Sequence, residues 1–192
     1  MATLSQVGIF GVGTGILMPK LRNRWNVTFS GIGGGAIGTD LSMQAVTISR
    51  PSLTFDEVPI DRYNSKVFVA GKHTWDMCSL TVEDDITNLA TTVIQAQLER
   101  QQRLIGASGP WLNTEATAST YKFGTVISML DGNETVTEIW NLEGCHINQC
   151  NWTDLDYATS DAVKIDLQIR FDHARQVIVP AVTGSAIGGL IL

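Results

Sequence analysis

Hydrophobic and polar residues alternate along much of this chain with the two-residue period of β-strands. The clearest case is the segment 162–172, in which charged or amide side chains alternate with apolar ones on the opposite face. Its apolar residues are Val163, Ile165, Leu167, Ile169 and Phe171. Similar patterns predict further strands at residues 24–30, 45–50, 74–83, 121–130, 134–142 and 145–152.

The period changes once, within residues 74–106. Cys78, Leu80 and Val82 follow the strand pattern, and the chain then passes through an acidic corner, Asp84 and Asp85. The next apolar positions recur at helical spacing and predict a helix over about residues 85–104. They are Ile86, Leu89, Ala90, Val93 and Ile94, followed by Gln97. We expect Asp84 and Asp85 to cap the first turn, because carboxylates accept the N–H groups that a helix start leaves free.

These elements predict a mainly β fold, a β-sandwich or open barrel of six to seven antiparallel strands with one flanking α-helix. The length suits a single domain over residues 1–192, with an N-terminal arm of about residues 1–18 and an apolar C-terminal tail of about residues 176–192. Because apolar arms are poor solvated tails, we expect them to pack on a neighbouring subunit. Both apolar ends are interrupted by glycines and are too short for a membrane anchor.

The connection 52–73 is long for a compact domain, and such loops usually have a function. Its aromatic and β-branched content is not typical of disorder. We expect an extended arm or hairpin that contacts a neighbouring subunit or ring, through Phe55, Val58, Pro59, Tyr63 and Phe68.

The charge balance argues against tight nucleic-acid binding. The net charge is −6, the pI is about 4.9, and the densest cationic run is Lys20-Leu21-Arg22-Asn23-Arg24. An acidic surface instead repels phosphates, as suits a wall that a polyanion slides past. The three cysteines are an odd number for a disulfide framework, so we expect free thiols at folding. Later oxidation of Cys78, Cys145 or Cys150 across a subunit boundary is a weaker alternative to buried free thiols.

Local motifs give no support for an enzyme. Cys145-His146 and Cys150 would need a second pair of ligands for zinc, and alternation places the two thiols on opposite strand faces. The glycines of 33–38 match GxGxxG, but no helix is predicted to open there. His73, His146 and His173 lie in no nucleophile motif. We therefore expect no catalytic residue, no metal and no cofactor.

Two ordered sets of motifs resemble the tail tube proteins of contractile-tailed bacteriophages. The first is Gly71-Lys72-His73-Thr74-Trp75, followed by the strand, Asp84-Asp85 and the helix. The second runs from Trp140-Asn141-Leu142-Glu143-Gly144-Cys145 through Leu155-Asp156-Tyr157 to the segment 165–174. With the residues that precede them, the resemblance covers about residues 17–175. The N-terminal arm, the insert 31–38 and the tail from Pro180 have no counterpart in that pattern.

The resemblance implies a structural virion protein that assembles into stacked homo-hexameric rings and forms the inner tail tube, which conducts DNA during ejection. Implied partners are the tail sheath, the baseplate and tail terminator proteins, and the tape measure protein and viral DNA, which pass without specific binding. The protein would assemble in the host bacterial cytoplasm. We expect the helix to cover the outer side of the subunit. Polar strand faces are lumen candidates: Asp166, Gln168, Glu134 and Glu138.

Two alternatives remain open from the sequence. One is the tube subunit of a type VI secretion or bacteriocin-like contractile system, to which the same family is related. The other, of a different class, is a soluble β-barrel that binds a ligand in its interior.

Overall fold

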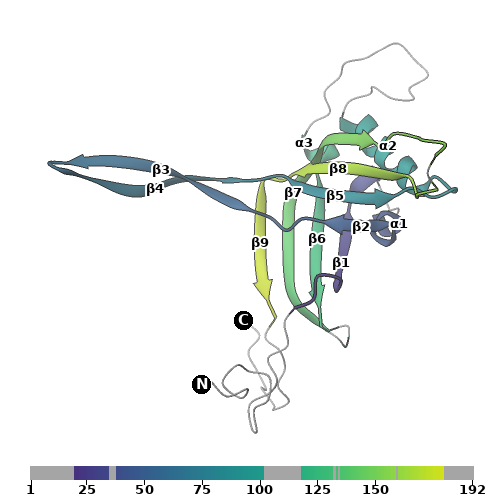
Figure 1. Cartoon of the computed structure of the whole chain (residues 1–192), viewed down its shortest axis with the longest axis horizontal. Helices are drawn as coiled ribbons and strands as arrows, with labels where there is room; N and C mark the ends of the chain where they lie inside the picture. Colours follow the sequence, from purple (N-terminus) through teal and green to yellow (C-terminus); the bar gives the residue numbers. More distant parts are fainter. Residues whose placement is uncertain are drawn as a thin grey trace, which may run out of the picture.

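The computed structural model describes residues 20–34, 38–101, 118–131, 133, 135–158 and 160–179. Within them the chain is mainly β, as predicted, with nine strands and four short or medium helices (Figure 1). The strands are β1 (Trp25–Ser30), β2 (Ala45–Ile48), β3 (Leu53–Arg62), β4 (Ser65–Trp75), β5 (Cys78–Glu83), β6 (Phe123–Leu130), β7 (Val136–Trp152), β8 (Lys164–Arg170) and β9 (His173–Ile178). The helical segments are η1 (Ile32–Gly34), α1 (Gly38–Met43), α2 (Leu89–Gln101) and α3 (Ala118–Tyr121).

Seven strands form one antiparallel sheet in the order β1-β6-β7-β8-β5-β2, with β9 paired to β7 beside this path. The long strand β7 divides the sheet into two layers. Its first part pairs with β6 and β9, and its second part pairs with β8. We call β1, β6, β7 and β9 layer 1, and β7, β8, β5 and β2 layer 2. The strands of the two layers run across one another in Figure 1.

Strand β7 joins two segments that the sequence predicts as separate strands, 134–142 and 145–152. The register shifts between Phe123 and Thr125 on β6, opposite Gly144 on β7, which has a φ of 69°. Such a bulge bends a strand, and glycine adopts this left-handed backbone without strain. The interruption that separates the two predicted strands is therefore the bend that carries one strand from layer 1 into layer 2.

The core lies between the inner faces of the two layers and α2. In layer 2 the register places Cys78 opposite Ile169, Leu80 opposite Leu167 and Val82 opposite Ile165, and all six side chains are buried. This confirms the predicted apolar faces of both segments, except at Val163, which precedes β8 and is exposed. The inner face of layer 1 contributes further apolar side chains, including Val27, Ile127 and Leu142.

Helix α2 buries Ala90, Val93, Ile94 and Gln97, as the helical spacing predicts. Two amide side chains on it bind neighbouring backbone. Gln97 accepts from the Gly33 N–H at 3.0 Å and donates to the Tyr121 carbonyl at 2.6 Å. Gln101 donates to the Ile147 carbonyl and accepts from the Ile147 N–H, at 2.9 and 3.0 Å. The Gln97 bonds hold the helix to η1 and α3, and the Gln101 bonds hold it to β7 just after its bend.

The helix begins at Leu89 rather than near residue 85, so the predicted start is wrong. A turn closes first, because the Asn88 N–H donates to the Asp85 carbonyl at 2.9 Å and Asn88 has a φ of 54°. Ile86 therefore points into solvent, and Leu89 is also exposed. Strand β9 is a further difference, since its residues overlap the start of the predicted C-terminal tail. The predicted N-terminal arm and the tail beyond residue 179 lie outside the described residues.

Candidate assembly surfaces

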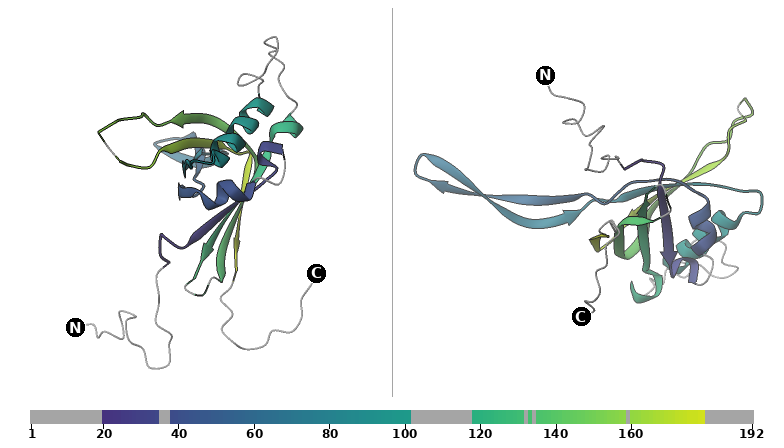
Figure 2. Two further views of the ribbon diagram at one scale, coloured as in Figure 1. Left: turned by 90° about the vertical axis from the view of Figure 1, so that its right-hand side faces the viewer. Right: turned by 90° about the horizontal axis from the view of Figure 1, so that it is seen from below.

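Strands β3 and β4 form a two-stranded hairpin that projects from the two layers (Figures 1 and 2). It corresponds to the segment 52–73, for which the sequence predicts an arm or hairpin. The register pairs Leu53 with Trp75 at its base and Arg62 with Ser65 at its tip. Nearly every residue along it is exposed. An isolated two-stranded hairpin is at best marginally stable in water, so this element needs a partner surface.

One face of the hairpin is aliphatic. Val58 lies opposite Val69, and Ile60 lies opposite Val67, so these four side chains share a face. They are 49, 47, 38 and 49% exposed, respectively. The opposite face near the tip carries the Asp61–Lys66 ion pair, with 3.7 Å between Nζ and Oδ1. The exposed aliphatic face indicates a surface that is covered in an assembly, and the ion pair indicates that the opposite face is solvated near the tip.

The five arm residues named from the sequence all lie on this hairpin. Phe55 and Phe68 are 53 and 62% exposed, and Tyr63 at the tip is fully exposed. Val58 belongs to the aliphatic face, whereas Pro59 and Phe68 pair on the other face. Sequence reasoning missed Ile60, Val67 and Val69. The alternation of the two segments would have identified them, once the strands were paired at this register.

The base of the hairpin is held by aromatic rings. The ring centroid of Trp75 lies 5.7 Å from that of Phe171, 6.3 Å from His73 and 6.2 Å from His173. Phe55 extends the cluster, with its ring 6.2 Å from His73. Contacts of this kind contribute energy beyond area burial. The Trp75 of the Gly71–Trp75 motif thus fixes the direction in which the hairpin leaves the body.

Layer 1 ends in an unpaired strand edge on both sides. Within the described residues, β1 pairs with β6 alone and β9 with β7 alone. Its outer face carries small polar side chains, among them Asn26, Thr28 and Ser128, together with the apolar Val126, Ile139 and Val177. The charged residues that the register places on this face are Glu143 on β7, and Arg175 beside His173 on β9. Free edges at both ends let such a layer continue into neighbouring copies.

The four lumen candidates do not share one surface. Asp166 and Gln168 lie on β8 in layer 2, where the Thr81 hydroxyl donates to Asp166 Oδ1 at 2.7 Å. Glu138 lies on the inner face of layer 1 and is only 3% exposed. Glu134 lies outside the described residues.

Glu138 is a buried carboxylate with several donors. Lys20 Nζ donates to Oε2, while Trp140 Nε1 and Gln176 Nε2 donate to Oε1 at 2.6 and 2.9 Å. The bond from Lys20 is the main cause that holds the pKa of Glu138 below its ordinary range. Burial opposes this, and the Trp140 and Gln176 bonds support it. The carboxylate joins the segment before β1 to β7 and β9.

Asp84 and Asp85 lie at the turn before α2. Asp85 Oδ1 accepts from the Leu89 N–H at 3.2 Å, and its other oxygen accepts from the Thr87 hydroxyl, which is the main cause of its lowered pKa. Asp84 Oδ2 accepts from the Thr91 hydroxyl at 3.0 Å. Both carboxylates therefore bind groups of the helix start.

The cysteines and histidines are spread over the fold. Burial raises the pKa of each thiol, Cys78, Cys145 and Cys150, to about 11. Burial is also the main cause that lowers the pKa of His146. Among the described residues, no group of three or more His, Cys, Asp or Glu side chains is placed to hold a metal ion. No described helix is both long and apolar enough to cross a membrane.

No protein-family model matches the sequence, and no curated protein matches it. Solved structures do share its fold. A chain of the anti-feeding prophage cap, the tube-terminating cap, has a TM-score of 0.63 at 15% identity, covering 86% of this chain and 95% of its own length. A second similar chain comes from the sheath–tube complex of an extracellular contractile injection system, PVC, in its extended state. Its TM-score is 0.61 at 14% identity, and the match covers 93% of this chain and 100% of that chain.

A third similar chain comes from the six-fold symmetrised baseplate of the anti-feeding prophage. Its TM-score is 0.60 at 15% identity, and the match covers 85% of this chain and 98% of that chain. All three proteins are parts of particles, and none is described by an enzymatic activity. At these identities the likeness concerns the fold. It bears out the resemblance to the tail tube family that the sequence motifs indicate.

Proposed function

We propose that this chain is the tube subunit of a contractile tail, which assembles into stacked hexameric rings inside a sheath. The observation that carries the proposal is the β3–β4 hairpin, whose aliphatic face is exposed in the single chain. Burial of apolar surface is the dominant driving force of association. A second copy of the chain supplies the cover in our proposal, and the hairpin extends from one subunit onto the next.

Layer 1 provides the wall of the tube in this proposal. Edge β9 of one copy pairs with edge β1 of the next, so that the ring closes and no free edge remains. The outer face of layer 1 then lines the lumen, in place of the layer 2 positions Asp166 and Gln168. Helix α2 stays on the side away from the lumen, where the sheath lies. Baseplate and terminator proteins bind the two ends of the tube, and the protein belongs to the virion.

This lumen differs from the acidic wall that the overall charge predicts. Glu143 and Arg175 offset each other, while the chain as a whole has a net charge of −6. A nearly neutral wall lacks the excess of cations that would hold the phosphates of a passing DNA. The tape measure protein and DNA therefore pass without specific binding.

A second candidate is the same tube in a particle that injects protein and carries no DNA. The observation in its favour is that a structural neighbour comes from an extracellular contractile injection system. Nuclease-protected DNA in purified particles decides between the two: its presence supports the tail of a virion, and its absence from intact particles supports the injection device.

The test of assembly is electron microscopy and sedimentation of the purified chain over a range of concentrations. We expect rings or tubes for the wild type, and monomers for the variant with Val58→Thr and Val69→Thr, which keeps shape and strand propensity but makes the face polar. The matched control changes Asp61 and Lys66 to Thr on the opposite face, and it should still assemble. A wild type that stays monomeric at high concentration, with sheath and terminator proteins added, would falsify the proposal.

A further inference from the structure

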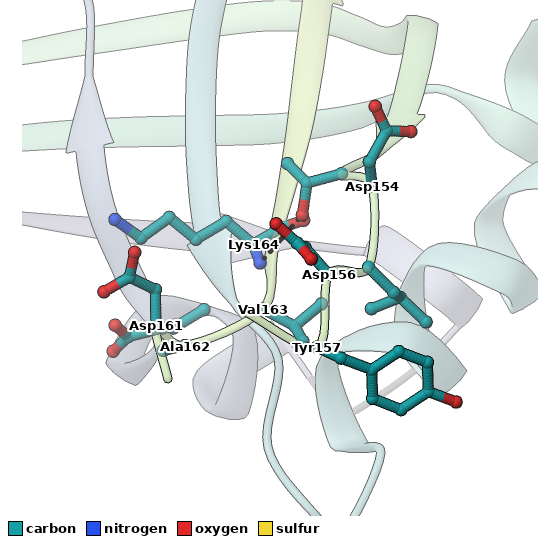
Figure 3. A pocket seen from close by; sticks show the side chains of 10 residues that line it. Asp154, Asp156, Tyr157, Asp161, Ala162, Val163 and Lys164 are labelled. Carbon is teal, nitrogen blue, oxygen red and sulfur yellow. Dashed lines mark hydrogen bonds between the residues drawn. The ribbon is translucent and has the colours of Figure 1, made fainter. Parts of the chain in front are cut away.

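The loop that follows β7 exposes two large side chains between acidic ones. Leu155 is 82% exposed and Tyr157 is fully exposed, and they alternate with Asp154 and Asp156. We call residues 154–157 the acidic loop. Asp161 and Glu83 lie beside it around the same cavity, with Lys164 as the one cation (Figure 3). Figure 3 shows the Tyr157 ring pointing away from Asp161 and Lys164.

Exposure of a leucine and a tyrosine at one loop is unfavourable in the single chain, because burying large apolar side chains stabilises a protein or a complex. Because Asp154 and Asp156 are negatively charged, the surface that binds this loop should be positively charged. Residues 154–157 are also part of a motif that the assembly proposed above does not use. The loop therefore has the composition of an inserted anchor: apolar side chains at its centre and negative charge at its rim.

A groove of opposite character lies elsewhere on the same chain. It has a volume of about 820 Å³ and lies between the inner face of layer 1 and strand β2. Its apolar lining includes Trp25, Ile48 and Met129, and its cations are Lys20, Arg22 and Arg50. We call it the cationic groove.

The charge of this groove is only partly neutralised within the chain. Lys20 pairs with the buried Glu138, and Arg50 lies 4.0 Å from the same carboxylate. The Arg50 side chain is 62% exposed and that of Lys20 is 50% exposed. Two of the three cations thus share one carboxylate, and Arg22 adds a third positive charge to the lining, which leaves the groove with excess positive charge over an apolar floor.

We propose that the acidic loop of one copy docks into the cationic groove of a second copy of this chain. Leu155 and Tyr157 then cover the apolar lining, while Asp154 and Asp156 approach Arg22 and Arg50. Charge complementarity favours this occupant over the hairpin of a neighbouring subunit, because the aliphatic face of the hairpin ends at its tip in Arg62, a charge of the same sign as the groove.

The acidic loop lies at one end of layer 2, apart from the start of β1 (Figures 1 and 2), where part of the lining of the cationic groove lies, from Lys20 to Asn23. Contact between two different patches is heterologous, so each copy can both give and receive the loop. Such a contact either closes into a ring or continues from one ring to the next along a tube. The inference rests on the proposed assembly and names one of its contacts.

Charge reversal tests the contact. The loop variant carries Asp154→Lys and Asp156→Lys, and the groove variant carries Arg22→Glu and Arg50→Gln, with Lys20 left in place to serve Glu138. We expect each to raise the critical concentration for tube formation at least tenfold, and the combined variant to recover most of that loss. The matched control, Asp76→Lys with Glu99→Lys, makes the same charge change elsewhere and should assemble like the wild type. Circular dichroism checks that every variant is folded.

A photoreactive phenylalanine at position 157 gives a direct readout. In assembled protein it should crosslink to a second chain within residues 20–25 or 46–50, identified by mass spectrometry. Crosslinks to the β3–β4 hairpin or to residues 1–19, or tubes that form normally from both reversed variants, overturn the docking and leave the tube proposal intact. A wild type that forms neither tubes nor any crosslink between chains overturns both.

Discussion

The buried Glu138 offers the sharpest test of the packing described here. The perturbation is Glu138→Gln, which keeps the shape of the side chain and removes its charge. The new amide group would point a donor at Lys20 or at the Trp140 and Gln176 donors, so at least one of the three bonds is lost. The matched control is Glu143→Gln on the same strand, where the carboxylate lies on the exposed outer face of layer 1.

The magnitude follows from the number and kind of bonds. A hydrogen bond to a charged group contributes about 1.5–3 kcal/mol, and a buried donor left without a partner adds a further cost. Because Lys20 is half-exposed, solvent weakens its bond to Glu138, and we take the contribution of that bond at the low end of this range. We therefore expect Glu138→Gln to lower the free energy of unfolding by about 3 kcal/mol, and Glu143→Gln by less than about 0.5 kcal/mol. In a chain of this length, about 3 kcal/mol corresponds to a fall in Tm of roughly 6–12 °C.

The effect should depend on pH with a definite sign. The folded pKa of Glu138 lies below its ordinary value of 4.5, so the ionised carboxylate stabilises the fold at pH values above that. This contribution is lost as the pH falls through the folded pKa. The difference in Tm between wild type and Glu138→Gln should therefore be largest near pH 7 and shrink in acid.

The assay is thermal and urea unfolding followed by circular dichroism, at a protein concentration too low for assembly and at several pH values. Equal Tm values for wild type and Glu138→Gln at pH 7 would refute the reasoning, because a buried carboxylate with three donors cannot lose its charge without cost. A constant difference across pH would refute the assigned pKa direction.

Three further predictions concern the core and the bend of β7. Gly144→Ala should lower the free energy of unfolding, measured in urea, by about 2–3 kcal/mol, since the position has a φ of 69° and a Cβ there would collide with the Asp172 carboxylate. The control Gly31→Ala has a φ of 81° but open space around it, and it should lower the free energy of unfolding by only about 1 kcal/mol. Gln97→Leu should lower the free energy of unfolding by about 2–4 kcal/mol in the same measurement, because the Gly33 N–H and the Tyr121 carbonyl lose their partner. The control Gln95→Leu, on the less buried side of α2, should leave the free energy of unfolding nearly unchanged. Cys78 and Cys145 should resist Ellman's reagent at pH 8 until the protein unfolds, because both are buried with a pKa of about 11, and fast modification of the folded protein would contradict their placement.

Local sequence determined most of the individual elements of this protein. The alternation of residues 24–30 and 162–172, and the helical spacing from Ala90 to Gln97, indicate which side chains face the core. The structure buries most of them, leaves Trp25 and Phe29 half-buried and exposes Val163. The reason is physical: strand and helix periods are properties of the backbone, so a sequence that repeats at either period can bury its apolar face in only one way. The motifs around Trp75, Trp140 and Phe171 likewise indicate the fold that the chain shares with the solved structures.

Tertiary structure alone decided how these elements meet. A bulge at Gly144 bends one strand through both layers, because its two parts pair with different strands. The turn at Asn88 delays the helix through a local hydrogen bond to Asp85, which overrides the helical spacing of the side chains. Glu138 looks like a solvated strand residue in sequence, but its donors come from residues 20, 140 and 176. The aliphatic face of the hairpin depends in the same way on the register that pairs Val58 with Val69. A face becomes a surface for assembly only when pairing between distant segments places its side chains together, and no local period contains that information.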